Sequence, residues 1–197
     1  MGRLWSDGSG PFPWNGFDVS FLNWVSRGLM ALREKALRIL FVCSGNTCRS
    51  PMAELLAGRA ARELGLASVE VRSAGTHATP GASASSGARR AVQRHQGSLE
   101  GHIATDLSPD LLDWADLVLT MGPGHLLQVR MLGAGGKASL LGAFAHGHDP
   151  GEEVDEAQGL AVPDPFGGDD DQYEATYQTL EKYVKAAMKR VAERREA

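Results

Sequence analysis

The sequence predicts an α/β fold, a three-layer doubly wound domain in which a four-stranded parallel sheet is flanked by helices. Apolar runs of strand length alternate with helical patterns from residue 38 onward. The chain has 197 residues, of which 43% are hydrophobic, enough to bury one core of this kind. Such alternation favours a parallel sheet covered on both faces, with ligand sites at the carboxyl ends of the strands.

Short apolar runs mark the strands, and longer segments with helical spacing lie between them. The expected strands cover 38–42, 69–73, 117–121 and 138–141. The expected helices before the last one cover 51–64, 85–94, 109–114 and a stretch after Pro123. The first of these helices is expected to end near Gly65, because glycine commonly follows a helix.

The last helix has the clearest pattern in the chain. Its apolar side chains recur at intervals of three and four residues and form one stripe, which predicts a helix packed against the core. The stripe consists of Tyr173, Tyr177, Leu180, Val184, Ala187 and Val191. Asp171 with Glu174 three positions later resembles a helix cap, so the helix is expected to begin near Tyr173.

Residues 43–51 read CSGNTCRSP and connect the first expected strand to the helix that follows it. A buried strand delivers Cys43 into a short loop, and Arg49 returns to the same centre as the helix begins. The thiolate is the nucleophilic form of cysteine, and a helix N-terminus beside an arginine favours that form. This order of residues predicts an active site that transfers a phosphoryl group.

The loop is also suited to hold the phosphate. Backbone N–H groups that converge on one point bind a tetrahedral anion, and the helix dipole adds partial positive charge. Arg49 supplies a planar fork for two phosphate oxygens. The expected phosphate-binding residues are Ser44, Gly45, Asn46, Thr47, Cys48, Arg49 and Ser50. No Gly-Lys-Ser/Thr follows, which argues against a nucleotide-binding loop.

Individual loop residues have expected roles. Gly45 allows close backbone approach or a positive φ, and Asn46 is among the few other residues that tolerate a positive φ. Ser50 can donate a hydrogen bond to the Cys43 thiolate, and it can cap a helix that Pro51 begins. The alternative for Cys43, a small buried apolar residue, does not account for its neighbours in the loop.

The loop resembles that of the low-molecular-weight protein tyrosine phosphatases, Cys-x-Gly-Asn-x-Cys-Arg-Ser-Pro, and the segment Ser73-Ala74-Gly75-Thr76 also matches that family. The resemblance implies a phosphocysteine mechanism without a metal or organic cofactor. It also implies a general acid, and Asp164 is the candidate because prolines stiffen the loop around it and a long helix follows. Phe166, two residues on, is expected to form a wall of the substrate pocket.

Thr47 bears on the choice of substrate. In the tyrosine phosphatases this position is usually bulky and aliphatic, and two aromatic residues commonly follow the Asp-Pro segment; here Phe166 is followed by glycines. The chain looks most like the protein arginine phosphatase branch, whose loop reads Cys-Thr-Gly-Asn-Thr-Cys-Arg-Ser, with Ser44 in place of a threonine. We therefore expect phosphoarginine in proteins as the substrate, with phosphotyrosine as the alternative.

Other functions fit less well. Thioredoxin-coupled arsenate reductases share the fold but need further cysteines, and this chain has only Cys43 and Cys48. A non-catalytic phosphoprotein-binding module would not need Cys43, Arg49 and Asp164 together. The two cysteines fit a reducing compartment, so the cytoplasm is expected. Cys48 can be a packed loop residue, or it can trap oxidised Cys43 as a reversible disulfide.

Composition excludes several partners. A net charge of −4 provides no basic footprint for nucleic acid, and no apolar run approaches the roughly 20 residues that a membrane span needs. We expect a monomer that acts on phosphorylated proteins. A metal site is not expected, and the acidic segment with two histidines is interpreted as a solvated loop. That segment contains His146, His148, Asp149, Glu152, Glu153 and Asp155. Surface or loop roles are expected for His77, His95, His102 and His125.

The first 36 residues stand apart from the domain, which is expected to span 37–197. They are rich in Gly, Pro and Trp, and nothing in them matches the family. Asp7 and Asp18 interrupt any apolar core of a signal peptide. One hypothesis is that translation begins at Met30; the other is an arm that binds a partner through aromatic residues such as Phe17 and Trp24.

Overall fold

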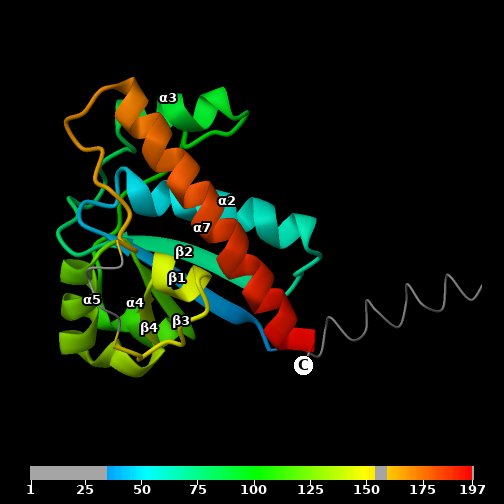
Figure 1. The fold of residues 1–197 in the computed structure, drawn as a ribbon. Helices are drawn as coiled ribbons and strands as arrows, with labels where there is room; N and C mark the ends of the chain where they lie inside the picture. The colour runs from blue at the N-terminus through cyan, green and yellow to red at the C-terminus, as the bar shows by residue number, and fades with distance from the viewer. Residues whose placement is uncertain (1–34, 154–158, 197) are drawn as a thin grey trace, which may run out of the picture. The chain divides into compact units, whose positions relative to one another are not determined.

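Four parallel strands form the sheet in the computed structural model, and their spatial order is β2-β1-β3-β4 (Figure 1). The strands are β1 (Leu37–Cys43), β2 (Val69–Gly75), β3 (Leu117–Thr120) and β4 (Ala138–Leu140). The structure describes residues 35–153 and 159–196. The predicted fold class is confirmed. The two hypotheses about the N-terminal extension concern residues 1–34, which lie outside the described part of the chain.

The strand order places a crevice at the end of β1. β2 lies on one side of β1 and β3 on the other, so the chain continues in opposite directions from the middle of the sheet. Cys43, the last residue of β1, is in register with Gly75 of β2, and Val42 is in register with Thr120 of β3. Open α/β sheets bind ligands at such a switch point, outside the carboxyl ends of the strands.

Helices cover both faces of the sheet (Figure 1). One buried cluster lies between the sheet and the helices α2, α3, α6 and α7. A second lies on the other face, against α4 and α5. These helices are α2 (Arg49–Glu63), α3 (Ser86–Arg94), α4 (Pro109–Trp114), α5 (Pro123–Val129), α6 (Leu141–Ala145) and α7 (Asp170–Glu196). Among the described residues, no helix is long and apolar enough to cross a bilayer.

Helix α7 confirms the predicted stripe but corrects its start. All six residues of the stripe are buried, and Tyr177 and Leu180 are fully so. The helix begins at Asp170 rather than near Tyr173. Its cap is Asp169, whose carboxylate accepts a hydrogen bond of 2.9 Å from the backbone N–H of Gln172. The predicted cap Asp171 was wrong, because that residue already lies inside the first turn.

The remaining differences are short elements. Helix α2 begins at Arg49, two residues before the predicted start, because the chain becomes helical while it is still closing the loop. Helix α6 follows β4 directly and has only five residues, too few for a periodic signal. Between α5 and β4 lie a π-helical turn, η1 (Arg130–Ala134), and a 3₁₀ turn, η2 (Gly135–Lys137). Gly133 interrupts η1 with a φ of 92°.

Candidate active site

The loop between β1 and α2 forms the floor of a pocket with a volume of about 230 Å³. The chain contributes to this pocket from the loop, from the turn after β2 and from the segment before α7. Its lining consists of Cys43, Ser44, Gly45, Thr47, Cys48, Arg49, His77, Asp164 and Phe166. Most of the residues predicted for the site therefore meet in one place. Asn46 and Ser50 are instead fully buried, where they support the loop.

Cys43 lies at the bottom of the pocket with 2% of its surface exposed. Its Sγ is 3.0 Å from the Oγ of Ser50. Ser50 Oγ accepts a hydrogen bond of 2.9 Å from Asn46 Nδ2 and donates to the carbonyl of Ala74 at 3.3 Å. Its single hydroxyl proton thus has two possible acceptors, and the sulfur of Cys43 is the nearer one. The predicted capping role of Ser50 was wrong, since Ser50 lies inside α2.

Asn46 holds the loop in shape through both its backbone and its side chain. Its φ of 51° is the left-handed conformation that the loop requires. Gly45, by contrast, does not have a positive φ. Asn46 Nδ2 donates to Ser73 Oγ at 2.8 Å, and Asn46 Oδ1 accepts from the backbone N–H of Thr105 at 2.8 Å. The Nε2 of His102 donates to the backbone carbonyl of Asn46 at 2.7 Å.

This network continues to a carboxylate on α2. Ser73 Oγ donates to Glu54 Oε2 at 2.6 Å and accepts from Asn46, so every hydrogen of the Asn46 amide has a defined acceptor. The carboxylate of Glu54 sets the direction of these hydrogen bonds, because an ionised carboxylate can only accept. Ser73 must therefore donate to Glu54 and accept from Asn46. The chain of bonds runs from Glu54 to Ser50 and ends at the sulfur of Cys43.

Gly75 allows the loop to lie directly against β2. A Cβ atom at Gly75 would come within 2.4 Å of the carbonyl oxygen of Ser44 and 2.8 Å of the backbone nitrogen of Asn46. The next two residues of the chain bind the loop: the N–H of Thr76 donates to Cys43 O, and the N–H of His77 donates to Ser44 O, both at 2.9 Å. Only glycine fits between strand and loop at this position.

Arg49 is almost fully buried, with 6% of its surface exposed. Its Nη1 donates to the carbonyl of Val162 at 3.4 Å, and its Nη2 donates to Ser44 Oγ at 3.4 Å and to the carboxylate of Asp164. Its Nε is buried and has no hydrogen-bond partner among the described residues. A buried charged donor without a partner is costly, so this atom indicates the place of an anionic ligand.

Asp164 comes from the segment that precedes α7, and about half of its side chain is exposed. One oxygen accepts from Arg49, and the other accepts from the backbone N–H of Phe166 at 3.2 Å. Phe166 lines the pocket as predicted, yet it is 77% exposed. The structure thus places a carboxylate and an apolar ring at the mouth of the pocket.

Four histidines have partners that the sequence did not reveal. His125 Nε2 lies 2.8 Å from Ser44 Oγ, His102 binds Asn46, and His77 lines the pocket. His95 Nε2 lies 2.7 Å from Glu174, and its ring stacks on Tyr177. The expectation that surface or loop roles suffice was therefore wrong for His95, His102 and His125, whose partners come from other elements, so no spacing in the sequence could have identified them. It holds for His77, which is exposed in a turn and lies 3.0 Å from the hydroxyl of its neighbour Thr76.

The pKa of His125 is lowered to about 4, mainly because the ring is desolvated and next because the positive charge of Arg49 lies close to it. Asp164 opposes this shift, and His77 adds to it. A histidine with such a pKa is neutral at physiological pH. His125 therefore contributes hydrogen-bonding capacity and no charge to the site.

The sulfur of Cys48 has hydroxyl groups of other elements as its neighbours. Its Sγ lies 3.2 Å from Ser85 Oγ and 3.5 Å from the hydroxyl of Tyr173. Both cysteines are reduced and buried. Burial raises the pKa of Tyr173, so its hydroxyl stays protonated beside the sulfur. The loop is tied to α3 on the same side, because the N–H of Ser85 donates to Thr47 O at 2.9 Å.

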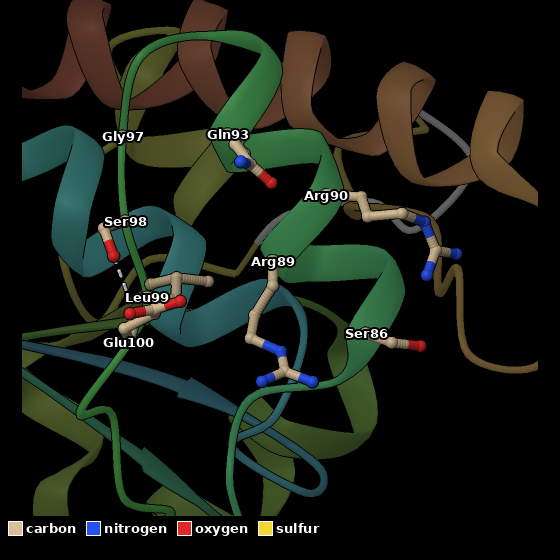
Figure 2. A pocket seen from close by; sticks show the side chains of 8 residues that line it. All are labelled: Ser86, Arg89, Arg90, Gln93, Gly97, Ser98, Leu99 and Glu100. Carbon is tan, nitrogen blue, oxygen red and sulfur yellow. Dashed lines mark hydrogen bonds between the residues drawn. The ribbon is translucent and has the colours of Figure 1, made fainter.

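A second hollow, on α3, differs in character from the loop pocket. Its volume is larger, about 400 Å³, and exposed polar side chains such as Arg89, Gln93 and Glu100 surround it (Figure 2). Arg90 also lines it, and both Arg90 and Arg94 bind Asp170. None of the predicted catalytic residues reaches this hollow. Chemistry rather than size therefore assigns the candidate active site to the loop pocket.

The described part of the chain contains no group of three or more His, Cys, Asp and Glu residues that could hold a metal ion. In the segment considered above, the Asp149 carboxylate binds Arg190 and Arg194, and Glu153 binds Arg130. His148 lies 3.5 Å from Glu152, and Asp155 is outside the described residues. Asp149 and Glu153 are thus paired with arginines rather than only solvated, whereas the Glu152 carboxylate accepts from the backbone N–H of Asp149 at 2.9 Å.

Comparison with known proteins agrees with this geometry. The family model of the low-molecular-weight phosphotyrosine protein phosphatases matches residues 38–197. A protein-arginine-phosphatase of Geobacillus stearothermophilus is 38% identical over 149 residues, which are 75% of this chain and 90% of that protein. The low-molecular-weight protein-tyrosine-phosphatase Etp of Escherichia coli K12 is 31% identical over 156 residues, 78% of this chain and 94% of that protein.

Among solved structures, the YwlE arginine phosphatase with its active-site cysteine replaced by a phosphorylated serine superposes with a TM-score of 0.70 and 35% identity. The match covers 81% of this chain and 99% of that one. A phosphorylated residue at the nucleophile position is the direct counterpart of a phosphocysteine intermediate. Together with the family match over residues 38–197, it shows that this chain belongs to the low-molecular-weight protein phosphatases, enzymes that work through a cysteine.

Proposed function

We propose that this enzyme is a protein arginine phosphatase, which hydrolyses phosphoarginine through a phosphocysteine intermediate. The observation that carries the choice of substrate is Thr47, which lines the pocket beside Cys43. A threonine leaves room and offers a hydroxyl group where a larger aliphatic residue would favour a flat phenyl ring. Relatives with 37–38% identity are protein-arginine-phosphatases, which supports the same choice.

In the first step, the thiolate of Cys43 attacks phosphorus and the P–N bond of the substrate breaks. The leaving nitrogen takes a proton from Asp164, so arginine departs as a stable cation or neutral guanidine rather than as an anion. Ser50 stabilises the thiolate before attack when its hydroxyl proton turns from the carbonyl of Ala74 to the nearer sulfur of Cys43.

In the second step, Asp164, now ionised, removes a proton from water. The resulting nucleophile attacks the thiophosphate, the S–P bond breaks, and Cys43 leaves as a thiolate with inorganic phosphate as the product. Throughout both steps Arg49 and the loop N–H groups face the phosphoryl oxygens. The free Nε of Arg49 is the donor available to them in the ligand-free structure.

Phe166 and Asp164 suit the rest of the substrate. The exposed ring of Phe166 can stack on a planar guanidinium, an arrangement that arginine side chains commonly adopt. Asp164 lies beside it, and its protonated carboxyl group can accept a hydrogen bond from a guanidinium N–H through one oxygen while the other oxygen carries the proton for the leaving nitrogen. Phosphorylated proteins are thus the proposed partners, and the free cysteines suit the cytoplasm. The monomeric state stays a prediction.

A tyrosine phosphatase is the second candidate, because an exposed aromatic wall also suits a phenyl ring and a tyrosine phosphatase is among the relatives. Matched phosphoarginine and phosphotyrosine peptides separate the two. We expect wild type to prefer phosphoarginine and Thr47→Ile to lose that preference, with Cys43→Ser as the inactive blank. Thr79→Ile is the matched control, since Thr79 is exposed and does not line the pocket. Preference of wild type for phosphotyrosine would refute the proposal.

A further inference from the structure

We infer that His125 is a positioning residue for Arg49, acting through the hydroxyl group of Ser44. The inference rests on the proposed function only in that Arg49 must hold a phosphoryl group. His125 belongs to α5, on the opposite face of the sheet from α2, and is 81 residues away from Ser44 in the sequence. Its contact with the loop is thus made by the fold and not by local sequence.

Ser44 Oγ stands between two partners. Arg49 Nη2 donates to it at 3.4 Å, and His125 Nε2 lies 2.8 Å away. A guanidinium can only donate, so the bond to Arg49 uses a lone pair of Ser44. The single hydroxyl proton of Ser44 is then free for Nε2 of a neutral imidazole. In this arrangement His125 turns the lone pairs of Ser44 toward Arg49.

The surroundings of His125 keep the ring neutral. Arg49 from α2, Asp164 from the segment before α7 and His77 from the turn after β2 are the charged or titratable groups around it. Burial and the positive charge of Arg49 disfavour the imidazolium more than Asp164 favours it. With Nε2 as the acceptor, the one N–H of the neutral ring lies on Nδ1, which is buried without a hydrogen-bond partner among the described residues. Protonation would add the second N–H at Nε2, where it would compete with Arg49 for the lone pairs of Ser44 Oγ.

This contact matters most after substrate binds. Asp164 must leave Arg49 to protonate the leaving group, and Arg49 then loses its strongest partner. Ser44 and the carbonyl of Val162 are the contacts that remain to its terminal nitrogens. With the hydroxyl of Ser44 oriented by His125, Nη2 keeps a fixed acceptor and the guanidinium of Arg49 keeps its orientation in the pocket.

A double-mutant cycle tests the inference, with His125→Leu, Ser44→Ala and the double variant. Because one neutral hydrogen bond contributes about 1 kcal/mol, each single change is expected to lower kcat for p-nitrophenyl phosphate by about fivefold. The kcat of the double variant should be no lower than that of the less active single variant, because both changes remove the same contact. His125→Gln should remain within about twofold of wild type, since its amide can accept the same hydroxyl proton.

Binding of inorganic phosphate provides a readout that does not depend on turnover. Measured by calorimetry in the Cys43→Ser background, the affinity should fall about fivefold with His125→Leu and recover with His125→Gln. Arg89→Gln is the control, because Arg89 lies in the hollow on α3 and not in this pocket. Thermal melts of all variants identify loss of fold.

Two results would overturn the inference: effects of His125→Leu and Ser44→Ala that multiply in the double variant, or a His125→Gln variant as impaired as His125→Leu. Failure of the proposed function has a different signature. In that case wild type would prefer the phosphotyrosine peptide or hydrolyse neither peptide, while phosphate binding by the Cys43→Ser protein would still depend on His125.

Discussion

Arg49 donates through Nη2 to the carboxylate of Asp164 across the pocket, so the residue that should hold the phosphoryl group is bound to the residue that should protonate the leaving group. The two come from segments 115 residues apart. In the ligand-free enzyme the positive charge of Arg49 is therefore paired with the negative charge of Asp164. A phosphate that enters must displace Asp164 from Arg49, and this displacement frees the carboxyl group for its catalytic role.

Replacement of Asp164 should separate binding from turnover. In Asp164→Asn the competing negative charge is gone, so the affinity for inorganic phosphate should rise by about fivefold, the equivalent of about 1 kcal/mol. Turnover should fall by about 10²-fold because the general acid is lost. Calorimetry with phosphate and steady-state kinetics with a phosphoarginine peptide check the two effects. Equal losses of both would show that Asp164 mainly supports the structure.

Gly75→Ala should damage the loop without touching any reacting group. The new Cβ would overlap the backbone of Ser44 and Asn46, and backbone atoms cannot move aside as a flexible side chain can. We expect a loss of about 1–3 kcal/mol in the free energy of unfolding and a drop in kcat of more than about tenfold. Urea unfolding and kinetics measure both.

Gly136→Ala is the matched control, because a Cβ there meets nothing within 4 Å and the backbone φ is not positive. It should leave stability and kcat near wild type. If Gly75→Ala behaved like this control, the close fit of loop and strand would not be a requirement of the fold.

The titration of His125 should appear in the pH dependence of stability. Unfolded histidine binds a proton near pH 6.5, whereas the pKa of His125 in the folded enzyme is about 4. Between these values the unfolded state holds more protons, so the free energy of unfolding decreases as the pH falls from 6.5 to 4. After allowance for the exposed part of the ring, the loss at this residue is about 1–2 kcal/mol.

Urea unfolding at pH 7 and pH 4.5 tests this expectation. His125→Gln cannot titrate in this range and should lose less stability between the two pH values than wild type. The same loss in both proteins would mean that other groups account for the acid sensitivity.

Cys48 allows a test of protection against oxidation. If Cys48 traps the sulfenic acid of Cys43 as a disulfide, peroxide-treated wild type should recover with dithiothreitol, and Cys48→Ala should recover less because Cys43 proceeds to irreversible forms. Mass spectrometry of the loop peptide identifies the products. Full recovery of Cys48→Ala would leave Cys48 as a packing residue, a role consistent with its contacts to Ser85 and Tyr173.

The sheet, the principal helices and the loop residues could be predicted because each depends on a local pattern. The stripe on α7 is periodic over many turns, and the loop between Cys43 and Arg49 holds its chemistry within a few consecutive residues. Asp164 lies far from the loop, but a stiff loop and a family resemblance compensated for that distance. Helix α6, with five residues, had no period to detect.

The supporting residues of the site could not be predicted, because tertiary structure alone brings them to the loop. His102 and His125 reach it from 56 and 81 residues away, and Glu54 reaches it through Ser73. Isolated histidines and a helical glutamate are common surface residues, so their types are uninformative. The structure of the loop explains why such supporting residues are needed. Asn46 has a left-handed backbone conformation and Ser50 is buried, so the polar groups of both residues require hydrogen-bond partners.

The bonds of Asn46 have a consequence for the rate of the reaction. Strand β2, residue 105 and His102 all fix the loop in its final shape while no ligand is present. The energy needed to gather its amide groups around one point was therefore spent during folding, so little reorganisation remains for the moment of transfer. Mutations that loosen these supports should act like a rise in the activation barrier, even though none of the altered side chains ever meets the substrate.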